Sequence, residues 1–378
     1  MTEPLTAYLD CAASTPLRSE AWDAMAPILR DGFGNPSGQH AVARSARKAL
    51  EEARDQVASV VGASPHDVVF TSGGTESDNL AIKGLTDAER PVAVCGATEH
   101  HAILDPVVAG HGRVAGVDGQ GRVDLDRLAS ALGHDVGVVS VMAVNNETGV
   151  VADLAAVAEV VRDLAPHAVL HTDAVQAANW LDLADVFRHV DAMSLAGHKF
   201  GGPKGTGALV LSERARPRPM LIGGGQEHER RSGTQNVAGA VGFAAALDVT
   251  ARQRSLQCAR IGALSDRILN EVSNIESVQV TVEPSLRVPG ICHLTTEVSS
   301  EDLLLLLDRE GVMASAASSC ASGALEPSHV LVAMGRSERQ AAGALRISMA
   351  HSTVDAEVDR LLQVLPGLVS RLSGGRSR

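Results

Sequence analysis

Short apolar runs alternate with amphipathic stretches over the first two thirds of this chain. Apolar residues spaced at helical intervals predict helices at 19–31 and 39–62. Continuous apolar runs predict strands at 67–73, 91–98 and 136–144, and also in RVAGV, AVLHTDA and VDAMSLAG. Because a helical pattern separates most neighbouring runs, the sequence predicts an α/β fold with a mostly parallel sheet.

The last third of the chain follows a different pattern. A long helix is predicted from about 236 to 273, followed by strands VQVTV, ICHLTT and ALRISM, short helices, and a final helix near 354–372. A chain of 378 residues is long enough for two cores. We therefore predict a large domain at 15–250 and a smaller α+β domain formed by 1–14 and 251–378.

Composition narrows the possible functions. Apolar residues make up 45% and charged residues 21%, which is typical of a globular protein. The net charge of −12 argues against direct binding of nucleic acid. No basic leader and no apolar run of about 20 residues is present, so we expect a cytoplasmic protein without a membrane span. The five scattered cysteines predict neither a disulfide framework nor a metal site.

Lysine is rare, with four lysines beside twenty-nine arginines, so few amines are available for chemistry that needs a neutral nitrogen. Lys199 follows an apolar strand in GHKFGGPKGTG, and Asp173 ends another in HTDAVQ, with Gln176 just after it. Pyridoxal phosphate chemistry needs a Lys that forms a Schiff base and a carboxylate beside the pyridine nitrogen. By itself, this pair fits a surface Lys and a helix-capping Asp equally well.

Other polar residues follow the predicted strands, where ligands of α/β sheets bind. Gly74 and Thr75 lie between a strand and a helix, which suits an anion, although a capped helix explains them too. His100 could lie against a cofactor ring or be a neutral core histidine. Asn146 could donate to a ligand oxygen or only form a turn.

Two residues of the last third also suggest chemistry. Cys320 stands in ASAASSCASGALEP, a run too small to pack a core, so we expect an exposed, mobile loop at about 314–326. A thiol there is either accessible to partners or incidental. Arg346 interrupts the apolar run ALRISM, where it would bind a substrate carboxylate or form a structural ion pair.

Taken together, these residues resemble the class V aminotransferase superfamily, and most closely the NifS/IscS-type cysteine desulfurases. The resemblance runs over almost the whole chain, through FGNPSGQH, FTSGGTESDNLAIKG, TEHHAILD, VNNETGVV, HTDAVQ, GHKFGGPKGTGAL, GGGQEHERRSGT, SSCASGALEPSHVL and LRIS. It implies a homodimer with the pyridoxal phosphate (PLP) transferase fold of type I, whose large domain holds a seven-stranded sheet.

The resemblance also implies the cofactor contacts. Lys199 would form the Schiff base, Asp173 would bind the pyridine nitrogen, Gln176 the phenolic oxygen, and His100 would stack on the ring. The phosphate would be held by Gly74, Thr75 and His198, and by Thr234 from across the dimer interface. Ala196 stands where many relatives carry a phosphate-binding Ser, so one contact is expected to be missing.

The family's reaction converts L-cysteine to L-alanine. By resemblance, Arg346, Asn146 and the nearby Asn35 would hold the substrate, and His100 would help to deprotonate its thiol. Cys320 would take the sulfur as a persulfide. A sulfur-acceptor protein would receive it, in iron–sulfur assembly, tRNA thiolation or DNA sulfur modification. A selenocysteine lyase, another class V aminotransferase, or a non-catalytic sulfur-relay subunit would share most of these motifs. Cys11 departs from the family pattern and has no predicted role.

Overall fold

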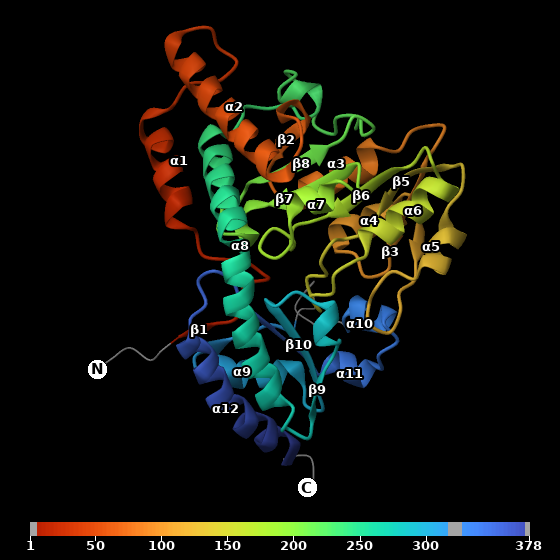
Figure 1. Ribbon diagram of the computed structural model, residues 1–378, viewed down its shortest axis with the longest axis vertical. Helices are drawn as coiled ribbons and strands as arrows, with labels where there is room; N and C mark the ends of the chain where they lie inside the picture. Colours follow the sequence, from red (N-terminus) through yellow and green to blue (C-terminus); the bar gives the residue numbers. More distant parts are fainter. Residues whose placement is uncertain (1–5, 317–326, 375–378) are drawn as a thin grey trace.

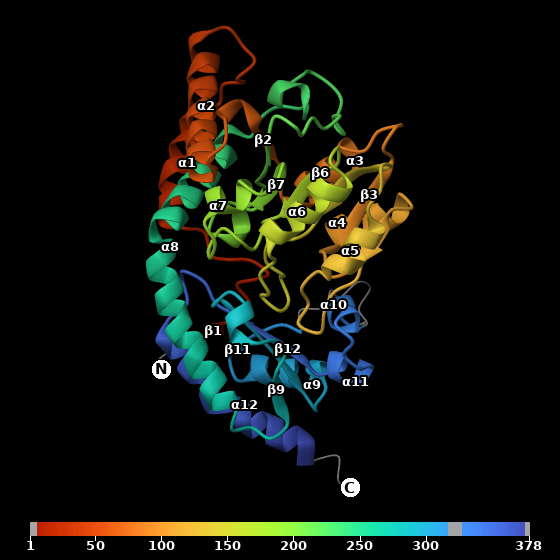
Figure 2. The ribbon, with the colours of Figure 1, turned by 45° about the vertical axis from the view of Figure 1, so that its right-hand side comes forward.

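The computed structural model describes residues 6–316 and 327–374 (Figure 1). Figures 1 and 2 show one half built around a large sheet, a second half with two small sheets, and the long helix α8 (Val237–Val272) running along both. In the described part of the chain, none of the helices has the length and apolarity that crossing a membrane requires.

The large sheet has seven strands in the order β2-β8-β7-β6-β5-β3-β4. All neighbouring pairs are parallel except the two that include β8, which is antiparallel to both β2 and β7. The bounds are β2 Val68–Thr71, β3 Val92–Gly96, β4 Arg113–Ala115, β5 Val136–Ser140, β6 Val169–Asp173, β7 Ala192–Ala196 and β8 Gly207–Leu211. The mostly parallel α/β sheet predicted from the apolar runs is confirmed.

Helices cover both faces of this sheet, which explains why its strands are apolar at successive positions. Val69 and Ala93 face a core that includes α3 and α4, whereas Val68 and Val94 face the core shared with α2, α6 and α8. The helices of this half are α1 Ser19–Asp31, α2 Ala41–Val61, α3 Gly74–Gly84, α4 His101–Ala109, α5 Leu125–Ala131, α6 Leu154–Leu164 and α7 Leu183–Phe187.

The second half is α+β, as predicted. A three-stranded antiparallel sheet has the order β12-β10-β9, and β1 pairs with β11 in parallel. Its elements are β1 Ala7–Tyr8, β9 Val278–Val280, β10 Ile291–Thr296, α9 Ser300–Arg309, β11 Val312–Met313, α10 His329–Ala333, α11 Glu338–Ala342, β12 Ala344–Ser348 and α12 Asp355–Gly374. The start of the chain thus pairs with the second half. The domain limits remain a prediction, and the limit at 250 falls inside the continuous helix α8.

Candidate active site

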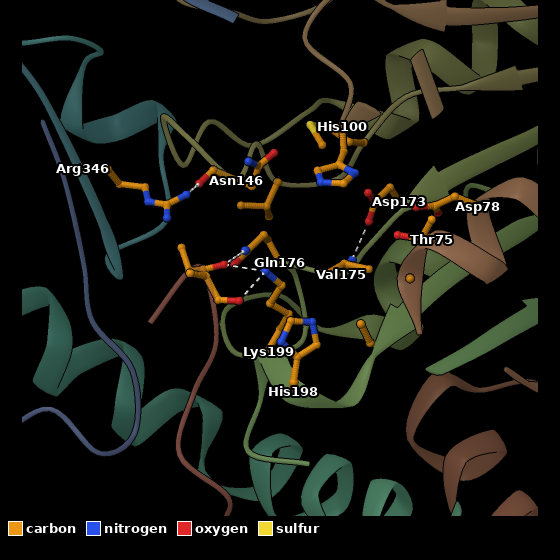
Figure 3. A pocket seen from close by; sticks show the side chains of 16 residues that line it. Thr75, Asp78, His100, Asn146, Asp173, Val175, Gln176, His198, Lys199 and Arg346 are labelled. Carbon is orange, nitrogen blue, oxygen red and sulfur yellow. Dashed lines mark hydrogen bonds between the residues drawn. The ribbon is translucent and has the colours of Figure 1, made fainter. Parts of the chain in front are cut away.

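A cavity of roughly 290 Å³ opens at the carboxyl ends of β6 and β7 and beside the N-terminus of α3 (Figure 3). This volume is at the lower end of the range for small-molecule sites. Its walls come from both halves of the protein: Ala12, Ala13, Gly74, Thr75, Asp78, His100, Met142, Val144, Asn146, Asp173, Val175, Gln176, Ala196, His198, Lys199 and Arg346. Ligands of open α/β sheets bind at this edge of the sheet.

Lys199 reaches the cavity from the turn that follows β7. Its Nζ donates hydrogen bonds to the carbonyl oxygens of Ala12 (2.6 Å) and Ala13 (3.0 Å), near the start of the chain. Burial, aided by the positive charge of Arg346, lowers the pKa of Lys199 to about 8, although Asp173 and Asp10 oppose this change. An amine with this pKa is partly neutral at physiological pH, so it can react as a nucleophile or move a proton.

Asp173 is the last residue of β6 and is buried. Its Oδ1 accepts a hydrogen bond from the Val175 amide at 2.9 Å. Burial raises the pKa of this carboxyl group, while His100, the Val175 amide and Lys199 favour its charged form. A cationic group bound next to Asp173 would therefore meet a carboxyl group that the Val175 amide holds in one orientation.

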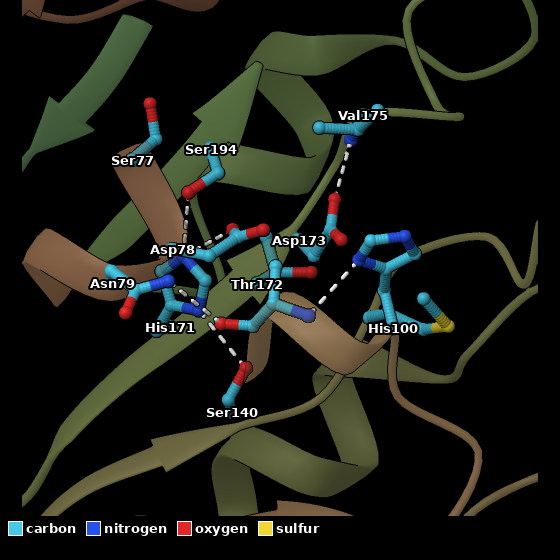
Figure 4. A network of polar contacts seen from close by, with 12 residues as sticks. Ser77, Asp78, Asn79, His100, Ser140, His171, Thr172, Asp173, Val175 and Ser194 are labelled. Atoms are coloured by element: carbon cyan, nitrogen blue, oxygen red, sulfur yellow. Dashed lines mark hydrogen bonds and ion pairs between the residues drawn. The ribbon is translucent and has the colours of Figure 1, made fainter. Parts of the chain in front are cut away.

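A buried polar network lies beneath Asp173 (Figure 4). His171 is hydrogen-bonded to Ser140 through Nδ1 and to Ser194 through Nε2, both at 2.9 Å. Burial lowers the pKa of His171 to about 3, so its ring is neutral. Burial and the charge of Asp173 raise the pKa values of Asp78 and Glu99 well above their usual range. Of these three buried carboxyl groups, Asp173 has the surroundings most favourable to a negative charge.

His100 precedes α4 and caps it. Its Nδ1 accepts a hydrogen bond from the Ala102 amide at 3.1 Å. Burial lowers the pKa of His100, with Asp173 opposing and Lys199 adding to the change. A neutral ring that accepts through Nδ1 carries its proton on Nε2. In this arrangement His100 is a hydrogen-bond donor toward the cavity rather than a base.

The N-terminus of α3 forms a second wall of the cavity. Gly73 makes no side-chain cap, so the first amide groups of the helix are available to an anion. A Cβ at Gly74 would lie 2.8 Å from the Val175 Cγ2 atom, which explains the glycine. His198 faces the same region, and burial lowers its pKa to about 4, so it would meet an anion as a neutral ring.

Arg346 projects from β12 of the second half and faces the cavity with Asn146 and Gln176 (Figure 3). Its Nη1 donates to the Asn146 carbonyl oxygen at 2.8 Å, and Gln176 Nε2 donates to the Ala12 carbonyl oxygen at 2.7 Å. Each of these side chains comes from a different segment, and together they offer hydrogen-bond donors to an anionic ligand.

The chain resembles known proteins over nearly its full length. The family model for class V aminotransferases matches residues 7–361. The chain belongs to this family. An IscS-like cysteine desulfurase from Mycobacterium tuberculosis is 42% identical, with 97% of this chain and 96% of that protein covered. A cysteine desulfurase IscS from Methanosarcina thermophila is 36% identical, with 98% and 94% covered.

Solved structures agree. A NifS-like protein superposes with a TM-score of 0.91 at 30% identity, with 97% of this chain and all of that chain covered. The resemblance to NifS/IscS-type desulfurases and the expected fold class are thus confirmed within the class V aminotransferases.

Two predicted residues lie elsewhere than in the cavity. Asn35 is exposed, and its side chain accepts a hydrogen bond from the Ser37 amide in a surface turn. Thr234 lines a separate hollow with Phe70 and Gly207. Neither residue lines the cavity of its own chain, so the contacts expected from the class V family would require a second copy. Cys320 lies outside the described residues.

The structure adds residues to which the sequence assigned no role. The carbonyl groups of Ala12 and Ala13, and the buried carboxyl group of Asp78, line the cavity. Asp78 belongs to the same motif as Gly74 and Thr75, so this motif could have pointed to Asp78 from the sequence alone. Cys11 is close by, but burial raises its pKa to about 12, so it stays a thiol.

Proposed function

We propose that this protein is a cysteine desulfurase that transfers the sulfur of L-cysteine to Cys320 and releases L-alanine. The observation that carries the proposal is the cavity that joins Lys199, Asp173 and Arg346. An amine with a lowered pKa, a buried carboxylate and a guanidinium are what amino-acid chemistry on pyridoxal phosphate requires. The class V family of the chain supports the same assignment.

Pyridoxal phosphate is the cofactor that fits these residues. The amine of Lys199, the carboxyl group of Asp173 and the free amides at the start of α3 would meet its aldehyde, ring nitrogen and phosphate. His100 would lie against the ring, with Gln176 near the phenolic oxygen. Thr75 and His198 would contact the phosphate, and Ala196 would contribute no hydroxyl. When bound, this cofactor would supply an aldehyde for the amino group and a ring that withdraws electrons.

Lys199 would then move the proton of the substrate. Its pKa of about 8 allows Nζ to accept a proton from the substrate's α-carbon and to return it. The carbonyl oxygens of Ala12 and Ala13 would hold the amine whenever it is free. Arg346 and Asn146 would hold the α-carboxylate, so the α-carbon stays near Nζ.

His100 would act on sulfur as a donor. Nδ1 already accepts a hydrogen bond from the Ala102 amide, and Nε2 already carries the proton of the neutral ring. The ring can therefore donate a hydrogen bond to a thiolate, but neither nitrogen is available to accept a further proton. The role as base that we predicted from the family pattern would first require the loss of that capping bond. We therefore assign His100 to hydrogen bonding with the substrate sulfur.

Chain length supports the role of Cys320. Ser315 exchanges backbone hydrogen bonds with Arg346, the residue proposed to hold the substrate. Cys320 lies five positions after Ser315, and so short a segment spans at most about 18 Å. The thiol would attack the substrate sulfur, which becomes bound to Cys320 as the carbon–sulfur bond breaks and the electrons of that bond stay with the alanine carbon.

A homodimer and a sulfur-acceptor protein complete the proposal. Large apolar side chains are exposed on α1, on the segment that follows it, and on the 220–222 segment: Trp22, Leu29, Phe33, Met220, Leu221 and Ile222. Exposed apolar surface of this kind is typical of a protein interface. The second copy would bring Thr234 and Asn35 to the cavity. The acceptor and the cytoplasmic location remain predictions.

The test is to incubate the protein with pyridoxal phosphate and L-cysteine and to measure alanine and protein-bound persulfide. We expect both from the wild type, whereas Cys320→Ser should keep the bound cofactor's visible absorbance but lose the persulfide. A keto acid in place of alanine would indicate an aminotransferase. Full activity of Cys320→Ser on selenocysteine alone would indicate a selenocysteine lyase, and no turnover by the wild type would indicate a non-catalytic subunit.

A further inference from the structure

Arg346 has an anionic partner inside the protein. Asp10 Oδ1 lies 2.7 Å from Arg346 Nη2, and the Arg346 side chain is only 5% exposed, against 23% for Asp10. With Nη1 bonded to the Asn146 carbonyl oxygen, two of the three guanidinium nitrogens are held by fixed acceptors. The buried Nε atom has no hydrogen-bond partner in the described part of the chain.

Asp10 is held firmly in place. The Cys11 amide donates to the Ser348 carbonyl oxygen at 3.1 Å, which ties this segment to β12, the strand that carries Arg346. The Asp10 carbonyl oxygen accepts from the Ala13 amide at 3.0 Å and from the Tyr8 hydroxyl at 3.2 Å. The Asp10 carboxylate therefore starts from a backbone that is fixed relative to the guanidinium.

Asp10 does not line the cavity, whereas Arg346 and Asn146 do. Its contact with the guanidinium thus leaves the cavity free for a ligand. We propose that Asp10 is a positioning residue that aims the Arg346 guanidinium at the α-carboxylate of the substrate. This inference rests on the proposed function, because it takes an amino acid as the ligand.

The physical argument has two steps. An Arg side chain has many rotamers, and a charge-assisted hydrogen bond to a fixed carboxylate selects one before the ligand arrives. A buried guanidinium without a counter-charge would also turn away from the cavity toward water. Loss of Asp10 should therefore weaken the binding of ligands that carry a carboxylate, and of those alone.

The experiment compares two ligands in the cofactor-loaded protein. L-alanine has the α-carboxylate, and cysteamine is the counterpart of L-cysteine without it. Their affinities are measured from the change in cofactor absorbance. For Asp10→Ala we expect about a tenfold or larger loss of L-alanine affinity and a similar rise in KM for L-cysteine, with little change in kcat. Cysteamine affinity should change less than about twofold.

Three further variants make the result specific. Asp10→Asn keeps an oxygen that can accept from Arg346, so it should fall between the wild type and Asp10→Ala. In an Arg346→Ala background, Asp10→Ala should add no further loss. Asp182→Asn, which removes one charge from the 2.7 Å Arg254–Asp182 pair away from the cavity, should change neither affinity.

Two results would overturn the inference: unchanged L-alanine affinity in Asp10→Ala, or equal losses for L-alanine and cysteamine. The second would show that Asp10 only maintains the fold. If the wild type makes no alanine from L-cysteine, the proposed function fails. The comparison of L-alanine with cysteamine still decides the role of Asp10, because it measures binding and not turnover.

Discussion

The two aspartates that line the cavity differ in the charge that their surroundings allow. Asp78 is fully buried, its Oδ1 has no hydrogen-bond partner among the described residues, and burial followed by the charge of Asp173 raises its pKa well above the usual range. Asp173 has the Val175 amide and the nearby Lys199. Asp78 should therefore be protonated when Asp173 is charged.

We expect Asp78→Asn to keep cofactor binding and activity within a few-fold, because an amide resembles a neutral carboxyl group in size and polarity. Since the raised pKa means that the folded protein retains a proton that the unfolded chain loses above about pH 4, stability should fall as pH rises. The variant should reduce that fall, which amounts to at most about 1.4 kcal/mol per pH unit and begins near pH 4; urea unfolding at a series of pH values from about 4 upward measures it. Asp173→Asn is the control, and it should lose activity. A large loss of activity in Asp78→Asn would show that Asp78 is charged.

Lys199 offers a direct test of its own lowered pKa. Only a neutral amine can attack the aldehyde of pyridoxal phosphate, so the rate of cofactor uptake by the cofactor-free protein should rise with pH. The pKa of about 8 places the midpoint of this rise near pH 8, well below that of an ordinary lysine. Stopped-flow absorbance at a series of pH values measures it, with Lys199→Ala as a control that should show no covalent uptake. A rise with no midpoint below pH 10 would contradict the assignment.

At the scale of single residues, the sequence pointed to a shared site where strand ends and motifs coincided, while the role of each residue stays a prediction. The residues that were predicted to share a site, and that the structure does bring to one cavity, are Gly74, Thr75, His100, Asn146, Asp173, Gln176, His198, Lys199 and Arg346. The role of Asp10 could not be predicted from the sequence, because its contact with Arg346 joins positions 336 residues apart. The direction in which His100 donates depends on its cap to Ala102, which a residue pattern does not encode.

At the scale of elements, the sequence predicted β5, β6 and β7, which are buried along their whole length. β8 was not predicted, although it too is fully buried, because its Gly207–Leu211 run follows directly on the Gly-rich segment after Lys199 and no α-helix separates it from β7. Its antiparallel pairing with β7 follows from that short connection. Helix limits were predicted well at α1 and α8, where apolar periodicity extends over several turns.

A short left-handed turn stands out among the elements. Glu227, His228 and Glu229 have φ values of 48°, 57° and 64°, a conformation that is unfavourable for residues other than glycine. The Glu227 carboxylate holds the turn, since it accepts from Arg54 at 2.8 Å and 3.1 Å and from the Phe70 amide and Gln235. Both side chains of the Arg54–Glu227 pair are almost fully buried.

We expect Glu227→Gln to destabilise the protein by about 3 kcal/mol, because the buried Arg54 charge loses its buried partner and keeps only the half-exposed Glu51 at 3.1 Å. Urea unfolding measures this loss. The exposed Lys48–Glu52 pair provides the matched control, and Glu52→Gln should change stability by less than about 0.5 kcal/mol. A loss below about 1 kcal/mol for Glu227→Gln would show that the turn does not depend on the ion pair.

At the scale of the whole molecule, one chain does not contain every contact expected of the site. Phe33 and Ile222 are 87% and 88% exposed. Such values are unusual for large apolar side chains on the surface of a monomeric protein. Thr234 lines a different hollow from Lys199. Sequence patterns alone could not separate these two places, because spacing along one chain does not say which copy completes a cavity.

Mixing two inactive variants tests whether the copies share their sites. Lys199→Ala removes the amine from its own cavity, and Thr234→Ala removes the hydroxyl proposed to serve the partner's phosphate. In a mixed dimer, one cavity would lose both groups and the other would keep both. We therefore expect recovery of about a quarter of wild-type activity after random exchange, from half of the dimers and one site in each. If Thr234 acted within its own chain, every cavity would lack one group, and mixing would restore nothing. Exchange without recovery, in the presence of saturating pyridoxal phosphate and with mixed dimers verified by mass, would contradict the shared site.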